Sequence, residues 1–180
     1  MNHTAFRPYL WVMMQQEKTI IRKALKKEAV LVHQLALNIW PKAFEQILSK
    51  AQMDYMIQMM YAPDVLEKEM ERGVEFYILR YNGTDMGYTA IEQKVPGAWK
   101  LHKIYLSQQL HGKGIGKFQL RSMEEVVKGY GAKELWLNVN RQNKAVDFYK
   151  SQGYEVQKTE DIDIGNGYFM NDYQMRKILD

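Results

Sequence analysis

Three neighbouring segments in the middle of the chain alternate apolar and polar residues, and they constrain the fold more than any other feature. They cover residues 74–81, 86–94 and 98–106. A hydrophobic period of two is typical of half-buried β-strands. Asn82-Gly83 and Pro96-Gly97 separate the segments, and such dipeptides favour tight turns between antiparallel strands. The sequence therefore predicts a three-stranded antiparallel meander.

Helical segments precede this meander. After a short predicted strand over residues 19–25, apolar residues recur every three or four positions over residues 28–40, which is typical of a helix. Pro41 is expected to end this helix, because proline lacks the amide hydrogen and its ring clashes with the preceding turn. Two further helices are predicted over residues 50–61 and 63–72. Together these helices form an arm between the first strand and the meander.

After the meander the chain alternates between helices and strands. The first predicted element is a helix that ends near Tyr130. A strand is predicted over residues 134–140, and a helix capped by Asn143 over residues 143–152. Two last strands are predicted over residues 154–163 and 168–178. The order is strand, helices, three strands, helix, strand, helix and two strands. This order predicts a mixed α/β (α+β) fold.

Composition narrows the class of protein. A chain of 180 residues suits one domain, expected over residues 15–180, with residues 1–14 as an N-terminal extension. No cysteine is present, which excludes disulfides, a thiolate zinc site and a cysteine nucleophile, and no metal is expected. The apolar run at residues 9–14 is too short for a signal peptide or a membrane span. We therefore expect a cytoplasmic protein without a membrane partner.

The charge pattern favours a small anionic ligand over nucleic acid. The chain has 25 Lys and Arg against 21 Asp and Glu, a net charge of +4, and its basic residues are scattered. Nucleic-acid binding would favour a stripe of basic residues with interleaved aromatic side chains. A basic nucleic-acid binder is thus a weak alternative.

The segment from His111 to Lys117 places three glycines after the third meander strand and at the start of a helix. A helix N-terminus offers unpaired N–H groups and a positive dipole, and glycines let a phosphate approach them. Lys113 adds positive charge. A Walker A loop does not fit, because His111 and Phe118 stand where it needs Gly and Ser or Thr. The dinucleotide fingerprint fails because its third glycine would fall at Lys117. A glycine-rich turn without a ligand remains an alternative.

This Gly-x-Gly-x-Gly-Lys run after a strand resembles the acetyl-CoA signature of the GNAT N-acetyltransferase superfamily. The family pattern is Arg or Gln, two residues, Gly, one residue, then Gly or Ala. It overlays His111-Gly-Lys-Gly-Ile-Gly116 with His111 at the usual Arg or Gln position. Downstream, Asn143-Lys-Ala-Val-Asp-Phe-Tyr149-Lys-Ser-Gln-Gly-Tyr154 looks like the family pattern N-x-x-A-x-x-x-Y-x-x-x-G-F, with the alanine one place early and Tyr154 in place of Phe.

The resemblance implies a GNAT-type fold, which is a central, mostly antiparallel twisted sheet of about seven strands with helices on both faces. It also implies acetyl-CoA as the cofactor and no metal. In the family, the strand before the loop binds the pantetheine arm and the loop binds the pyrophosphate. The expected cofactor contacts are Ile104, Tyr105 and Leu106 on the strand, His111, Gly112, Lys113, Gly114, Ile115, Gly116 and Lys117 in the loop, and Asn138 and Asn143 nearby.

Acetyl transfer to an amine sets two requirements for protons. An amine with a pKa of about 10.4 must be deprotonated, and the leaving thiolate must receive a proton. Tyr149 occupies the family's tyrosine position, which implies that it is the general acid. The strand at residues 98–106 offers only His102 as a general base, and water-relayed deprotonation is an alternative.

The acceptor is less defined than the cofactor. The arm and the last hairpin form the acceptor site in the family, and residues 160–172 are acidic and aromatic. The layout resembles the bacterial spermidine/spermine N-acetyltransferase-like branch, which implies a polyamine or similar primary amine. Alternatives are a protein N-terminus, a lysine or an amino acid, and a non-catalytic acyl-CoA sensor. The methionine-rich residues 53–70 fit either a homodimer interface or a core helix.

Overall fold

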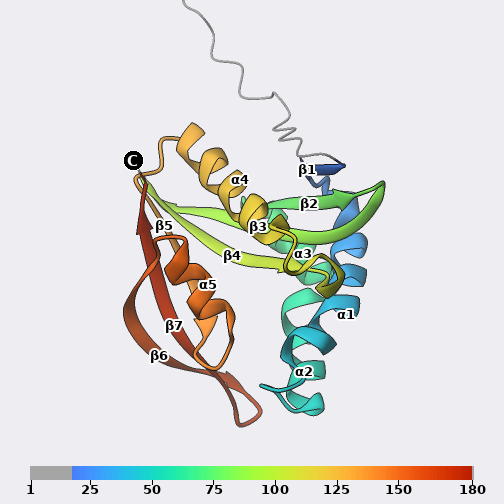
Figure 1. Ribbon diagram of the computed structural model, residues 1–180. Coiled ribbons are helices and arrows are strands. Elements are labelled where there is room, and N and C mark those ends of the chain that lie inside the picture. The colour runs from blue at the N-terminus through green and yellow to red at the C-terminus, as the bar shows by residue number, and fades with distance from the viewer. Residues whose placement is uncertain (1–17, 180) are drawn as a thin grey trace, which may run out of the picture.

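The computed structural model describes residues 18–179, whose strands form one seven-stranded sheet (Figure 1). The strand order is β1-β2-β3-β4-β5-β7-β6. Within the described sheet, β4 and β5 are the parallel pair and every other pair is antiparallel. The predicted mixed α/β fold with a mostly antiparallel sheet is confirmed. The extension expected over residues 1–14 lies outside the described residues.

The elements follow the predicted order. The strands are β1 Thr19–Lys23, β2 Glu75–Tyr81, β3 Thr84–Val95, β4 Ala98–Leu106, β5 Glu134–Asn140, β6 Glu155–Gly165 and β7 Tyr168–Ile178. The helices are α1 Ala29–Phe44, α2 Lys50–Tyr61, α3 Pro63–Glu71, α4 Ile115–Gly129 and α5 Ala145–Ser151, with short 3-10 helices at Lys26–Glu28 and Gln108–Leu110. Within residues 18–179, no helix is both long and apolar enough to span a bilayer.

Helix α1 continues through Pro41 to Phe44, so the prediction that proline ends this helix is wrong. Proline removes one backbone donor from the helix. The last turn is nevertheless held by packing, because Trp40 and Phe44 are 2% and 7% exposed and their ring centroids lie 4.5 Å apart. Burial of two aromatic side chains outweighs the missing hydrogen bond.

Helices cover both faces of the sheet, each over its own apolar cluster (Figure 1). Helices α4 and α5 pack over one face, where Leu101, Met123 and Leu137 are buried. Helices α1 to α3 pack over the other face, where Tyr61 and Tyr88 are buried. The buried members of the methionine-rich segment, Met53 and Met56, belong to this second cluster, which favours their interpretation as core residues.

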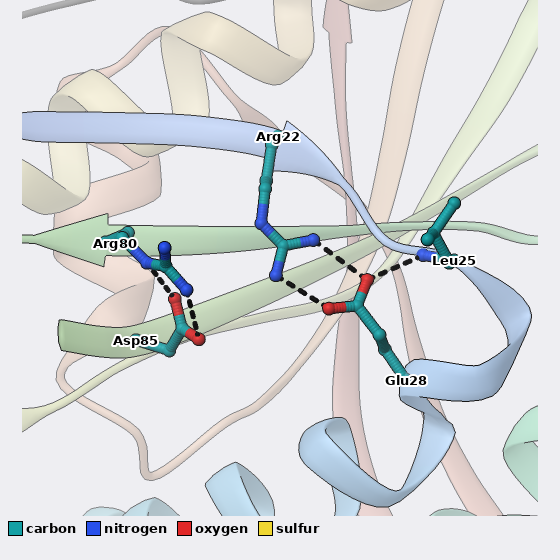
Figure 2. A network of polar contacts seen from close by, with 5 residues as sticks. All are labelled: Arg22, Leu25, Glu28, Arg80 and Asp85. Atoms are coloured by element: carbon teal, nitrogen blue, oxygen red, sulfur yellow. Dashed lines mark hydrogen bonds and ion pairs between the residues drawn. The ribbon is translucent and has the colours of Figure 1, made fainter. Parts of the chain in front are cut away.

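Two bidentate ion pairs lie near the edge of the sheet, one between β1 and the segment before α1 and the other between β2 and β3 (Figure 2). The Arg22 guanidinium donates to both carboxylate oxygens of Glu28, at 2.8 and 2.7 Å, and the Leu25 amide donates to Glu28 at 2.8 Å. Arg80 binds Asp85 in the same way, at 2.7 and 3.0 Å. The hydrogen bonds from Arg22 lower the pKa of Glu28 to about 2. Both pairs lie in the half of the sheet that carries the meander.

Candidate functional site

Strands β4 and β5 separate part-way along their length and leave a gap in the sheet. Their pairing runs from Ala98 and Glu134 to Leu101 and Leu137, whereas β4 continues to Leu106 and β5 to Asn140. Figure 1 shows the two strands diverging. The other edge of β4 remains paired with β3. Backbone groups of residues 102–106 that face β5 therefore lack a strand partner, and an extended ligand can pair with them.

Strand β4 is bulged where the gap opens. Ala90 of β3 pairs with Lys103 and Ile91 pairs with Leu101, so His102 is the extra residue. Beyond the bulge, β3 approaches β4 closely: a Cβ added at Gly87 would lie 2.8 Å from the Tyr105 carbonyl oxygen. Glycine at position 87 thus sets the position of the gap-lining segment of β4.

The predicted phosphate loop leads from the open end of the gap into helix α4. Gly112 and Gly114 adopt φ of 74° and 77°, a conformation that glycine tolerates best, and a side chain added at either would meet no atom within 4 Å. The first helical bond joins the Phe118 amide to the Gly114 carbonyl at 3.0 Å. The preceding N–H groups have no partner within the helix. This open, amide-rich turn fits a polyanionic group.

The side chains of the loop also fit the binding of a polyanionic group. His111 is exposed, and its Nε2 lies 3.3 Å from the carbonyl oxygen of Leu106, which links the loop to the end of β4. Lys113 and Lys117 are exposed and add positive charge beside the first turn of α4. The structure therefore brings together the residues predicted for the cofactor on β4 and those in the loop.

Tyr149 lies on helix α5, on the α4 side of the sheet. Its side chain is 7% exposed and its ring meets that of Tyr154 edge-on, with centroids 5.9 Å apart. Burial raises the pKa of Tyr149, so the phenol stays protonated at neutral pH. The helix predicted to begin at Asn143 begins at Ala145. Asn143 instead stabilises the preceding turn, where its Oδ1 accepts a hydrogen bond from the Ala145 amide at 2.9 Å.

The Tyr105 side chain lies on the opposite face of the sheet, against the cluster under α1 to α3. Burial raises the pKa of the Tyr105 phenol, and the neighbouring Tyr61, Tyr149 and Asp172 raise it further. Asp172 on β7 is 7% exposed, and burial raises its pKa to about 6.

Two predicted polar residues, Asn138 and His102, are tied to carboxylates. Asn138 donates to Glu160 at 3.3 Å, and its Oδ1 is buried without a partner in the described structure. His102 Nε2 lies 2.7 Å from Glu92 Oε2. Burial lowers the pKa of His102, so the imidazole is neutral at pH 7. His102 is therefore already engaged on the side of β4 that pairs with β3.

A cavity of about 460 Å³ lies where helix α2 meets the last hairpin. The hairpin is held there because Gln52 donates to the Phe169 carbonyl at 3.0 Å and Tyr55 to the Ile164 carbonyl at 2.6 Å. The lining residues come from the α1–α2 connection, α2, the end of β5 and the hairpin: Ile47, Leu48, Gln52, Asn140, Arg141, Gln142, Gly167, Tyr168, Phe169 and Asn171. This cavity offers a path towards the open end of β5.

The acidic stretch predicted to line an acceptor site is divided between the two faces of β6, because alternate strand residues point to opposite faces. Glu160 contacts Asn138 on the gap side. Asp161 pairs with Arg141 at 2.6 Å and with Asn171 at 2.7 Å, and Asp163 accepts from the Gly165 amide. Only part of the predicted acidic lining therefore faces the gap, namely Glu160 and, at the other end of the predicted stretch, Asp172.

A family model described as an acetyltransferase (GNAT) domain matches residues 42–177. The chain belongs to the GNAT acetyltransferase family. A spermidine N(1)-acetyltransferase of Thermoplasma acidophilum is 27% identical over 148 residues, which are 79% of this chain and 92% of that protein. The PaiA N-acetyltransferase of the same organism, solved in complex with coenzyme A, superposes with a TM-score of 0.75 at 25% identity, covering 89% of this chain and 98% of that one. A GCN5-related N-acetyltransferase from Rhodopseudomonas palustris has a TM-score of 0.76 at 17% identity, covering 92% and 99%.

The protein is thus a GNAT N-acetyltransferase that uses acetyl-CoA and an amine acceptor. Among the described residues, no cluster of three or more His, Asp or Glu side chains has the arrangement of a metal site. The family membership agrees with the open turn at Gly112 to Gly114 and the gap beside β4, which are the features that fit a long, phosphate-bearing cofactor.

Both family motifs also fit in an earlier frame. Gln109-Leu-His-Gly112-Lys-Gly114 supplies the Gln that the pattern requires, and in this frame Gly114 immediately precedes helix α4. Counted from Asn143, the second pattern would put its tyrosine at Lys150. Counted from Gln142, it puts Ala145, Tyr149 and the following glycine at their expected spacing. Gln109 and Gln142 were missed by the alignments that start at His111 and Asn143. The spacing of the glycines and of the alanine could have identified both residues from the sequence.

Proposed function

We propose that the enzyme transfers the acetyl group directly from acetyl-CoA to a primary amine, preferably a polyamine, with Tyr149 as the general acid. The observation that carries this proposal is that Tyr149 is buried in the apolar cluster against which Ile104 and Leu106, on the gap-lining segment of β4, pack. Bound acetyl-CoA supplies an activated acyl group and a thiolate leaving group. The Tyr149 phenol, kept protonated by its raised pKa, would give its proton to that thiolate.

The cofactor-binding residues follow from the geometry of the gap and the loop. Backbone groups of Ile104, Tyr105 and Leu106 would pair with the pantetheine arm, since β4 has no partner on that edge. The amides from Gly112 to Lys117 would bind pyrophosphate at the start of α4, with Lys113 as a further charge. Contacts from Asn138 and Asn143 remain predictions, and the bonds of these two side chains within the protein favour positioning roles.

Support for a polyamine acceptor comes from two sources. One relative, at 27% identity, is a spermidine N(1)-acetyltransferase. In this chain, the carboxylates of Glu160 and Asp172 lie on the gap side of the last strands, where they would attract a cationic amine. Neither source distinguishes one polyamine from another. We further propose a cytoplasmic location, which the absence of cysteine supports.

A panel of acceptors tests the proposed substrate class. Thiol release from acetyl-CoA is measured with spermidine, spermine, monoamines, amino acids, a lysine peptide and an aminoglycoside. We expect kcat/KM for the polyamines to be at least about tenfold above the rest, which is the effect of one good charge-assisted contact. Equal or higher values for amino acids or peptides would contradict the polyamine proposal.

A Tyr149→Phe variant tests the proposed acid. We expect kcat to fall by about 10²- to 10⁴-fold, with the Kd for acetyl-CoA unchanged, because only the hydroxyl is removed. Tyr130→Phe is the matched control, since Tyr130 is 44% exposed and its hydroxyl contacts Glu75, away from the gap. A Tyr149→Phe enzyme as active as the Tyr130→Phe control would contradict the assigned role.

A further inference from the structure

Asp172 is a buried carboxylate at the open end of the gap. It lies on β7, where its Cα is paired with that of Asn140 at the end of β5 and with that of Glu160 on β6. Its exposed fraction is 7%. Carboxylates are rarely buried unless they are paired or functional, so this position requires an explanation.

Several polar groups face Asp172 from the surrounding elements. Burial is the main cause of its raised pKa, and the charge of Glu160 on β6 acts in the same direction. Hydrogen bonding by Asn138 on β5, and the positive charges of Lys100 on β4 and Arg141 after β5, oppose the rise without cancelling it. Arg141 is itself paired with Asp161 at 2.6 Å. Asp172 is therefore only partly neutralised by its neighbours.

The location of Asp172 joins the cavity to the gap. Its partner Asn140 lines the 460 Å³ cavity, and its charge acts on the phenol of Tyr105 on β4. An amine that enters through the cavity would therefore meet the Asp172 carboxylate at the open end of the gap.

We propose that Asp172 is the general base that removes a proton from the acceptor ammonium group. This inference rests on the proposed function. The Asp172 carboxylate takes one proton from the ammonium nitrogen, and the freed electron pair forms the N–C bond to the acetyl carbon. As the C–S bond breaks, its electron pair stays on sulfur, which takes the proton of Tyr149. The second nitrogen proton restores Tyr149, and Asp172 releases its proton to solvent.

The alternative base, His102, is less well placed. Its neighbour Leu101 is still paired with β5, so His102 lies where the gap only begins to open. Its Nε2 is engaged by Glu92 on β3 at 2.7 Å, away from β5 and the cavity. Asp172 lies level with Asn140, at the far end of β5, where the strands have already separated.

The ionisation states of the two proposed groups are complementary. A pKa of about 6 leaves Asp172 ionised at pH 7 and makes it a stronger base than an ordinary aspartate. The raised pKa of Tyr149 keeps that phenol protonated at the same pH. Two environments that shift a base and an acid in this way are typical of paired proton-transfer groups. Burial of a bound ammonium group would favour loss of its proton, whereas the Asp172 charge would hold the group in place.

The test compares Asp172→Asn and Asp172→Glu with the wild type, using spermidine and acetyl-CoA. For Asp172→Asn we expect kcat/KM at pH 7 to fall by about 10²- to 10⁴-fold. The loss should shrink towards about pH 10, because the fraction of neutral amine rises there. Asp172→Glu should recover part of the activity. The Kd for acetyl-CoA, measured by calorimetry, should stay within about twofold in both variants, which shows that the fold and the cofactor site are intact.

Asp64→Asn is the matched control, because Asp64 is exposed in the first turn of α3, where it pairs with Lys68, and lies outside the proposed site. An Asp172→Asn enzyme as active as this control at pH 7 would overturn the inference, and so would a loss that is equal at pH 7 and about pH 10. The proposed function fails in a different way, with no thiol release by the wild type on any amine. The two failures are thus distinguishable.

Discussion

The two halves of the sheet differ in how their faces are used. In the half formed by β1 to β4, apolar side chains are buried on both faces, with Leu79 in the cluster under α4 and Ile78 in the cluster under α1. In the half formed by β5, β7 and β6, one face is apolar and the other carries Asn138 and Asp172. The first half is thus apolar on both faces, whereas the second leaves polar groups available at the gap.

Two carboxylates, one in each half of the sheet, illustrate the difference between the halves. Glu28 in the first half is fixed by Arg22 and the Leu25 amide, and its pKa is lowered to about 2. Asp172 in the second half is buried without full compensation, and its pKa is raised to about 6. The first carboxylate stabilises the fold when ionised, whereas the second destabilises it. Binding and catalytic sites often contain groups that lower stability in this way.

The largest stability effect is expected from the apolar core of the first half. Ile78→Ala should lower the free energy of unfolding by about 2–5 kcal/mol, because Ile78 is fully buried and its removal leaves a cavity. Val156→Ala on β6 should cost less than about 1 kcal/mol, since Val156 is 39% exposed. Urea unfolding measures both. Equal losses in the free energy of unfolding would contradict the difference proposed between the two halves.

Gly87→Ala should have the next largest effect, about 1–3 kcal/mol of stability. The added methyl group would lie 2.8 Å from the Tyr105 carbonyl oxygen, so β4 must shift at the gap, and acetyl-CoA affinity should fall as well. Gly129→Ala is the control, because a side chain there meets nothing within 4 Å. Calorimetry of both variants gives the affinities, and unchanged binding by Gly87→Ala would contradict the role given to this strand contact.

Glu28→Gln should lower stability by about 1–2 kcal/mol at pH 7, a value discounted for partial solvent screening. Because the folded pKa of Glu28 is lowered, its contribution is present above the ordinary pKa of 4.5 and is lost as the pH falls towards about 2. Thermal unfolding between those pH values should therefore bring the variant and the wild type together. A difference in stability that persists at the lowest pH would show that the Glu28 charge is not the cause.

Asp172→Asn should have the smallest effect, a gain of about 1 kcal/mol at pH 7, because the destabilised charge is removed. The folded pKa of Asp172 is raised, so the destabilisation is fully present above about pH 6 and disappears as the pH falls below 3.8. The wild type should approach the variant in thermal stability over that range. A less stable variant at pH 7 would indicate that Asp172 is a structural residue.

Local signals in the sequence predicted the fold well. Asn82 and Gly83 adopt φ of 49° and 82°, which is the hairpin turn that their residue types favour. The end of α1 was not predictable, because the signal of Pro41 is local whereas the burial of Trp40 and Phe44 depends on distant strands. The position of β7 between β5 and β6 likewise depends on long-range pairing.

The candidate site was predicted as far as its motifs extend. The loop at Gly112 to Gly114 and the β4 segment lie together, as the resemblance implied. Asp172 was predicted only as one member of the acidic stretch at residues 160–172, because a single aspartate in a strand is ordinary until its burial and its neighbours on β5 and β6 are known. Motifs that bind a common cofactor are readable in one chain, while acceptor residues become visible only through tertiary contacts.

The most direct test of the proposed acetyl-CoA site is amide hydrogen exchange with and without acetyl-CoA. We expect slower exchange on binding at residues 104–106 of β4 and at residues 112–117 of the loop, because these amides would pair with the cofactor. We expect little change in β1 and β2, on the far side of β3. Protection that leaves both the loop and β4 unchanged would contradict the claim that the gap between β4 and β5 is the acetyl-CoA site.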